Sequence, residues 1–164
     1  VSHQWCGRAH PDPDFRQLSI LQSLFMRASA GHLTVELDII SSIVYATKAS
    51  VRPKDLRTSP EWLMWYDYFS VPQPGVQEYP RLRDDFDNAI SSLAAYVSAC
   101  RYFLVLAPAV MHEDGSIVNY RSWKARGWCR FERLARVMTS AIGATVLVVE
   151  GEQRLVEAGA HNFL

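Results

Sequence analysis

The residues best suited to chemistry lie in RGWCRFERLARVM, the stretch from Arg126 to Met138. Trp128 and Cys129 are followed, three residues after the cysteine, by Glu132, inside a pattern typical of an amphipathic helix. At about 100° per residue the glutamate falls beside the apolar stripe, so its carboxylate can face a crevice. The simpler interpretation is a solvated charge that the helix dipole favours and that nearby arginines accompany. The local pattern alone favours this simpler interpretation.

Other candidate chemistries have weaker support. Cys129 could be a thiol nucleophile, but no histidine is placed beside it by spacing, and a cysteine before an apolar helix is usually part of the core. His3, His10 and His112 could converge on a metal, yet none lies in an HxH or HExxH pattern, so we expect no metal site. Asp67 can point toward the same region as Glu132, although an aspartate that ends a strand is usually a turn former. Glycine-rich phosphate loops are absent from the sequence.

The composition narrows the class of protein. The chain has 164 residues, of which 49% are hydrophobic, enough for one core and too few for two ordinary domains. Lysine plus arginine equals aspartate plus glutamate, at 17 each, so no overall field would attract nucleic acid or anionic lipid. No apolar run approaches the ~20 residues of a membrane span, and no signal peptide is recognisable. The expectation is a protein of the cytoplasm with neither nucleic acid nor membrane as a partner.

The cysteines and the two ends of the chain add two expectations. The three cysteines form no CxxC pair, so they fit neither a disulfide framework nor a zinc site, and we expect reduced thiols. The chain opens on VSHQW without a methionine and stops at HNFL. We therefore expect a single domain, 1–164, taken from a longer protein.

Apolar periodicity predicts alternating strands and helices. We expect strands at 1–5, 61–70, 101–108 and 144–151, the last two as continuous apolar runs typical of buried parallel strands. Helices are expected at 15–30, 34–46, 82–100 and 128–138, the second of which a strand could replace because it is rich in β-branched residues. Loops are expected at 6–14, at 71–80 and from 109 to about 127.

This alternation predicts an α/β fold with right-handed crossovers and a mostly parallel sheet. A flavodoxin-like three-layer sandwich is a natural arrangement, with strand order 2-1-3-4, complete or lacking a fifth strand, and with helices on both faces. In such sheets ligands bind beyond the carboxyl ends of the strands, at the switch point between strands one and three. The loop 6–14 and the start of the helix that carries Glu132 should meet there.

The order of the motifs can be compared with a known family. VSHQW precedes a helix, EWLMWYDYFS leads into a proline-glycine loop, and DDFDNAISSLAAYVSACRYFLVLAP is followed by SWKARGWCRFE. This order resembles a TIR (Toll/interleukin-1 receptor) domain, in which a strand ending in serine and an aromatic residue opens the fold and a WCxxE motif lies in a later helix. The resemblance covers nearly the whole chain, apart from an insertion around 33–60 and a missing last strand and helix. Trp65, Asp67 and Gln73 also match the W-x-D…Q signature of TIR-like fungal heterokaryon-incompatibility domains.

The resemblance implies an activity. In TIR domains that cleave NAD+, the motif glutamate is catalytic, so Glu132 inherits the role of stabilising the positive charge that builds on ribose as nicotinamide leaves. Nicotinamide is a good leaving group, so no general acid is required and NAD+ is a substrate with no further cofactor. The resemblance further implies substrate contacts from Ser2, Gln4, Trp5 and Trp128. The expected function is a TIR-type NAD+ glycohydrolase in a signalling or defence protein of innate immunity.

The resemblance also implies an alternative. Animal receptor TIR domains keep the WCxxE motif yet act as adaptors, and the loop that mediates their self-assembly corresponds to Val71, Pro72, Gln73, Pro74 and Gly75. A non-catalytic signalling module that binds other TIR domains is therefore the alternative, and a nucleoside-processing transferase on a similar sheet is a third. Plant members carry an arginine two residues after the first-strand serine, where this chain has Gln4, and the leucine after the motif glutamate is replaced by Arg133.

Overall fold

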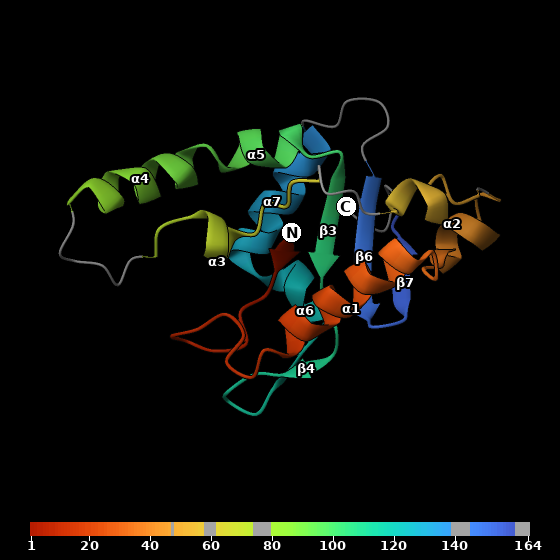
Figure 1. Ribbon diagram of the computed structural model, residues 1–164, viewed down its shortest axis with the longest axis horizontal. Helices are drawn as coiled ribbons and strands as arrows, with labels where there is room; N and C mark the ends of the chain where they lie inside the picture. The colour runs from red at the N-terminus through yellow and green to blue at the C-terminus, as the bar shows by residue number, and fades with distance from the viewer. Residues whose placement is uncertain (47, 58–61, 74–79, 139–144, 160–164) are drawn as a thin grey trace.

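A computed structural model describes residues 1–46, 48–57, 62–73, 80–138 and 145–159 of the chain. Its centre is a sheet of five strands in the order β1-β3-β6-β7-β2, accompanied by a separate β4–β5 hairpin (Figure 1). The strands are β1 (Ser2–His3), β2 (Val35–Leu37), β3 (Tyr102–Leu106), β4 (Val110–Met111), β5 (Ile117–Val118), β6 (Thr145–Gly151) and β7 (Arg154–Glu157). All neighbours in the sheet are parallel except β6 and β7.

The described residues form eight helical segments around the strands. They are α1 (Arg16–Ala30), α2 (Ile39–Ile43), the 3₁₀ helix η1 (Pro53–Leu56), α3 (Asp67–Ser70), α4 (Pro80–Ser91), α5 (Leu93–Ala99), α6 (Tyr120–Ala125) and α7 (Gly127–Met138). Figure 1 shows α1 in front of the sheet and α6 and α7 behind it. The predicted α/β class is therefore confirmed.

Side chains along β3 and β6 point alternately to the two faces of the sheet, so each face has its own part of the core. Leu106, Leu147 and Val149 pack with side chains of α1, whereas the neighbouring Val105 and Val148 pack with side chains of α6 and α7. Successive side chains of a strand point to opposite faces, so a continuous apolar run is needed where helices cover both. This explains why β3 and β6 lie close to where the apolar runs at 101–108 and 144–151 predicted them.

The predicted strand order 2-1-3-4 is wrong in its second strand. Residues 62–66 form no ladder and 67–70 are the helix α3. The segment nevertheless lies beside β1, since the Val1 nitrogen donates to the carbonyl of Trp65 at 2.6 Å. The neighbouring position of strands one and three is confirmed, because Ser2 pairs with Val105 in a parallel register.

Three other element predictions need correction. The helix predicted at 34–46 is instead β2 followed by the short α2, and β2 lies at the far edge of the sheet, against β7. The long loop predicted after β3 contains the β4–β5 hairpin and α6. β7, which returns antiparallel beside β6, lies in a stretch where no strand is predicted. A short local pattern could not identify β2, because its partner β7 lies far away in the sequence.

The apolar stripe of α7 does not face the core. Trp128, Phe131, Leu134 and Met138 are exposed, and the buried face carries Cys129, Glu132, Ala135 and Arg136. Polar partners explain this orientation. Arg136 donates hydrogen bonds to the carbonyls of Val97, Cys100 and Arg101, where α5 ends and β3 begins. Burying the apolar stripe instead would leave these carbonyls without a donor.

Candidate active site beside strand β1

Glu132 lies in the interface between α7 and β1, and only 7% of its surface is exposed. Its carboxylate oxygen Oε2 accepts a short hydrogen bond from the hydroxyl of Ser2. The same hydroxyl oxygen accepts a hydrogen bond from the indole Nε1 of Trp123, at 3.0 Å. Ser2 thus forms a buried chain of hydrogen bonds with two residues far from it in the sequence, Trp123 and Glu132, and the glutamate is not a solvated surface charge.

The surroundings of Glu132 shift its acidity. Burial raises the pKa of its carboxyl group to about 7, since the charged form is poorly solvated, and the negative charge of Asp67 acts in the same direction. The hydrogen bond from Ser2 opposes this rise in pKa, because it stabilises the carboxylate. Near neutral pH the group is therefore close to its titration midpoint, as is typical of acids and bases in active sites.

His3, which follows Ser2 in β1, contacts Asp67. The His3 ring is fully buried, packs edge-on against Tyr66 with ring centroids 4.5 Å apart, and has its Nε2 3.4 Å from the Asp67 Oδ1. Within the described residues neither ring nitrogen has a hydrogen-bond partner. Burial lowers the pKa of His3, so the ring is neutral at neutral pH and its contact with Asp67 is that of a dipole with a charge.

The predicted substrate-binding residues have different surroundings. Ser2 contacts Glu132 directly, as described above. Gln4 is buried and already bonded, because its side-chain oxygen accepts from the Ser122 hydroxyl at 2.7 Å. Trp5 is half-buried, and its ring lies edge-on to that of Tyr68. The structure thus brings Ser2, and neither Gln4 nor Trp5, into hydrogen-bond contact with the carboxylate.

Trp128 precedes Glu132 by about one helical turn, but its side chain is 61% exposed. Its ring lies edge-on to that of Phe131, at a centroid distance of 6.2 Å. In this conformation the tryptophan is neither core nor the wall of a closed pocket.

The predicted self-association segment is only partly described. Val71, Pro72 and Gln73 are half-buried, and the Gln73 amide donates to the carbonyls of Tyr68 and Val71 at 3.2 and 3.0 Å. Pro74 and Gly75 lie outside the described residues. The glutamine therefore closes the chain onto the end of α3.

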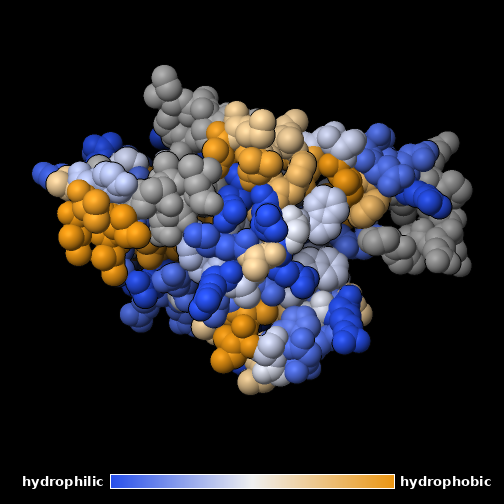
Figure 2. Space-filling model, turned by 180° about the vertical axis from the view of Figure 1, so that it is seen from behind, coloured by the Kyte–Doolittle hydropathy of each residue, from blue (hydrophilic) through white to orange (hydrophobic). Residues whose placement is uncertain are grey.

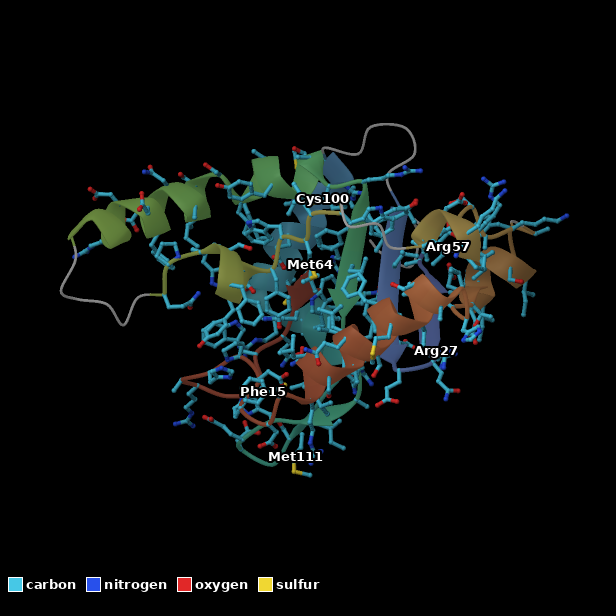
Figure 3. All side chains as sticks on the ribbon, in the orientation of Figure 1. Phe15, Arg27, Arg57, Met64, Cys100 and Met111 are labelled. Carbon is cyan, nitrogen blue, oxygen red and sulfur yellow. The ribbon has the colours of Figure 1, made fainter. Side chains whose placement is uncertain are left out.

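Glu132 lines neither of two cavities found among the described residues. The larger, of about 880 Å³, is apolar and lies between α1, the segment 62–65 and the start of β3, with Met64 and Cys100 among its lining residues (Figure 3). The smaller, of about 260 Å³, lies between the loop 6–14 and the β4–β5 hairpin that carries Met111. The loop 6–14 thus forms a wall of this second cavity.

Sequence reasoning missed part of the site. Trp123 stands in a stretch expected to be a loop, and nothing in its neighbours indicates that its indole reaches β1. Asp67 is predicted either to point toward the region of Glu132 or to form a turn. Its contact with His3 depends on α3 lying beside β1, which the sequence does not predict. In the described part of the chain no group of three or more histidine, cysteine, aspartate or glutamate side chains is arranged to hold a metal ion.

The chain matches no protein-family model, no curated protein and no solved structure. The resemblance to TIR domains therefore depends on the order of the sequence motifs alone. No described helix is both long and apolar enough to cross a lipid bilayer.

Proposed function

We propose that the chain is a TIR-type NAD+ glycohydrolase, in which Glu132 is the catalytic residue, and that it acts in cytoplasmic signalling or defence as part of innate immunity. The observation that supports this proposal is the buried carboxylate of Glu132, held by Ser2 and carrying a pKa raised to about 7. A carboxylate shielded from water stabilises a nearby positive charge more strongly than an exposed one, because the local dielectric is low.

The chemistry follows from that environment. When the bond between nicotinamide and ribose breaks, nicotinamide keeps the bonding electron pair and the sugar becomes a ribosyl cation. The ionised form of Glu132 stabilises this cation and accepts hydrogen bonds from ribose hydroxyls, and water then adds to the sugar to give ADP-ribose. Ser2 fixes the orientation of the carboxylate. Because Glu132 is almost closed to solvent, the side chains that cover it must move aside for the sugar to bind.

A direct test is nicotinamide release by the purified chain at high concentration. We expect release from the wild type and a loss of at least about 100-fold in Glu132→Ala, since one carboxylate supplies most of the charge stabilisation. Glu152→Ala, which removes an exposed carboxylate, is the matched control and should retain full activity. Circular dichroism establishes that the variants are folded. Equal release from wild type and Glu132→Ala would refute the proposal.

The second candidate function is a non-catalytic module that binds other copies of the same domain. Its support is the exposed apolar surface leading into α3, where Leu63 is 99% exposed and Trp62 and Phe69 are also exposed. Absence of nicotinamide release from wild type at every protein concentration, together with self-association, would favour this candidate.

A further inference from the structure

One face of α7 presents large apolar side chains to solvent. Trp128, Phe131, Leu134 and Met138 recur at helical spacing, and each is between 43% and 77% exposed. We call these four residues the α7 stripe. A contiguous apolar stripe on a helix is typical of a surface that binds a partner, because its exposure to water is unfavourable.

The exposed charges on α6 and α7, from residue 120 to 138, are all positive. Arg121, Arg126 and Arg130 are exposed and Arg133 is half-buried, and the only acidic residue from 120 to 138 is the buried Glu132. Among the described residues, none of these four arginines forms an ion pair. Figure 2 shows strongly hydrophilic side chains directly beside hydrophobic ones on this side of the molecule. A complementary partner must therefore combine apolar groups with negative charge.

Helix α4 of the same chain has this composition. Asp84, Asp85 and Asp87 are exposed, and among the described residues they too form no ion pair. On the helical wheel Asp85 and Asp87 lie on either side of the half-buried Phe86 and Ile90. In Figure 1, α4 projects from the body of the molecule beyond α5, so it is accessible to a neighbour.

We infer that α4 of one copy packs along the α7 stripe of a second copy, with its aspartates facing the arginines around the stripe. Both helices have 12 residues, about 18 Å each, so they can cover one another along their length. The occupant is a second copy because the same chain supplies both the acidic apolar helix and the basic apolar surface. This pairing is independent of NAD+ cleavage and uses neither Glu132 nor the segment 71–75.

Reciprocal charge reversal tests the pairing. Sedimentation velocity of the wild type should show concentration-dependent association that weakens between about 50 and 500 mM salt, since screening reduces attraction between exposed charges. Arg126→Glu with Arg130→Glu should weaken self-association by about tenfold or more, and Asp85→Lys with Asp87→Lys should do the same. An equimolar mixture of the two double variants should associate again, because each then offers a surface complementary to the other.

The control is Lys48→Glu with Lys54→Glu, which makes the same change in net charge as Arg126→Glu with Arg130→Glu at exposed positions away from both helices and should associate as the wild type does. Circular dichroism establishes that each double variant is folded, and recovery of association in the mixture shows that both surfaces are intact. A wild type that stays monomeric at every concentration would overturn the inference, and so would a mixture that fails to associate. Binding of an unrelated acidic helical peptide by a monomeric wild type would assign the stripe to a different partner and also overturn self-pairing.

Discussion

Arg136 carries a guanidinium group into the interior, where it is only 2% exposed. Its Nη1 donates to the carbonyls of Val97 and Cys100, and its Nη2 to that of Arg101. Burial lowers the pKa of this guanidinium, yet an arginine remains charged at neutral pH. The residue therefore joins α7 to the end of α5 by hydrogen bonds that no apolar side chain can replace.

Replacing this arginine should be costly. We expect Arg136→Met to lower the free energy of unfolding by about 3 kcal/mol, because several buried carbonyls lose their donor. The free energy of unfolding of Arg136→Lys should lie between those of the wild type and Arg136→Met, since an ammonium group can reach only some of these carbonyls. Urea denaturation measures the difference, and Arg130→Met on the exposed side of the same helix is the control. Equal stabilities of Arg136→Met and Arg130→Met would contradict the structural role.

The raised pKa of Glu132 predicts that the stability of the protein depends on pH. Its pKa is raised from 4.5 to about 7 in the folded protein, so the folded state holds the proton more tightly than the unfolded state. The resulting stabilisation is complete below about pH 4.5 and is lost as the pH rises through 7. At pH 8 the charged carboxylate lowers the free energy of unfolding by about 3 kcal/mol relative to its protonated form, since each pKa unit corresponds to about 1.4 kcal/mol.

Glu132→Gln keeps the shape of the side chain and removes this titration. The variant should therefore be more stable than the wild type at pH 8 and should have a flatter stability profile between pH 5 and about 8. Thermal denaturation at a series of pH values gives the comparison. A wild type whose profile matches that of Glu132→Gln across this range would show that the carboxylate is not buried in solution.

At the scale of elements, α1 ends where its sequence predicts. Gly31 has a positive φ of 74°, and its amide and that of His32 bond back to Ala28 and Arg27 in the arrangement that closes many helices. A Cβ added at Gly31 would meet nothing within 4 Å, so any cost of a substitution comes from the backbone conformation alone.

Two substitutions at this position separate backbone strain from packing. We expect Gly31→Ala to destabilise the protein by about 1 kcal/mol, and Gly31→Asn by less, because asparagine tolerates the left-handed region. Chemical denaturation of both variants tests this order. If alanine is tolerated as well as asparagine, the left-handed end of α1 is not maintained in solution.

Local sequence patterns predict the positions of several elements but not their orientation. Positions of α1 and α7 follow from apolar periodicity, because each helix is long enough for the period to be recognised, and those of β3 and β6 follow from their continuous apolar runs. The orientation of α7 does not follow, because the partners of Glu132 and Arg136 come from β1 and from the junction of α5 and β3. The buried face of a helix is therefore not always its most apolar face.

At the scale of the whole molecule, Glu157 joins residues 50–51 to the sheet. Its carboxylate, only 9% exposed, accepts hydrogen bonds from the amides of Ser50 and Val51 and from the Ser50 hydroxyl. Residues of β7 thus hold the chain that returns from the edge strand β2, although about a hundred residues separate the partners in sequence.

Removing this link should loosen one side of the molecule. In Glu157→Ala we expect faster hydrogen exchange at residues 48–56 and in β2, with β3 and β6 unchanged, because the central strands are held by their own ladder and core. Glu152→Ala, at an exposed neighbouring position, should leave exchange unaltered. Uniformly faster hydrogen exchange across the sheet would mean instead that residues 48–56 and the central strands unfold together.

The sequence alone determined the α/β class, the central apolar strands and the adjacency of the first and third strands, because these depend on local periodicity and on the rules for connecting parallel strands. Tertiary structure decided which strand lies at each edge, which face of α7 is buried and which groups surround Glu132. Those features depend on hydrogen bonds between residues as far apart as Ser2 and Glu132, and no local pattern encodes such partners.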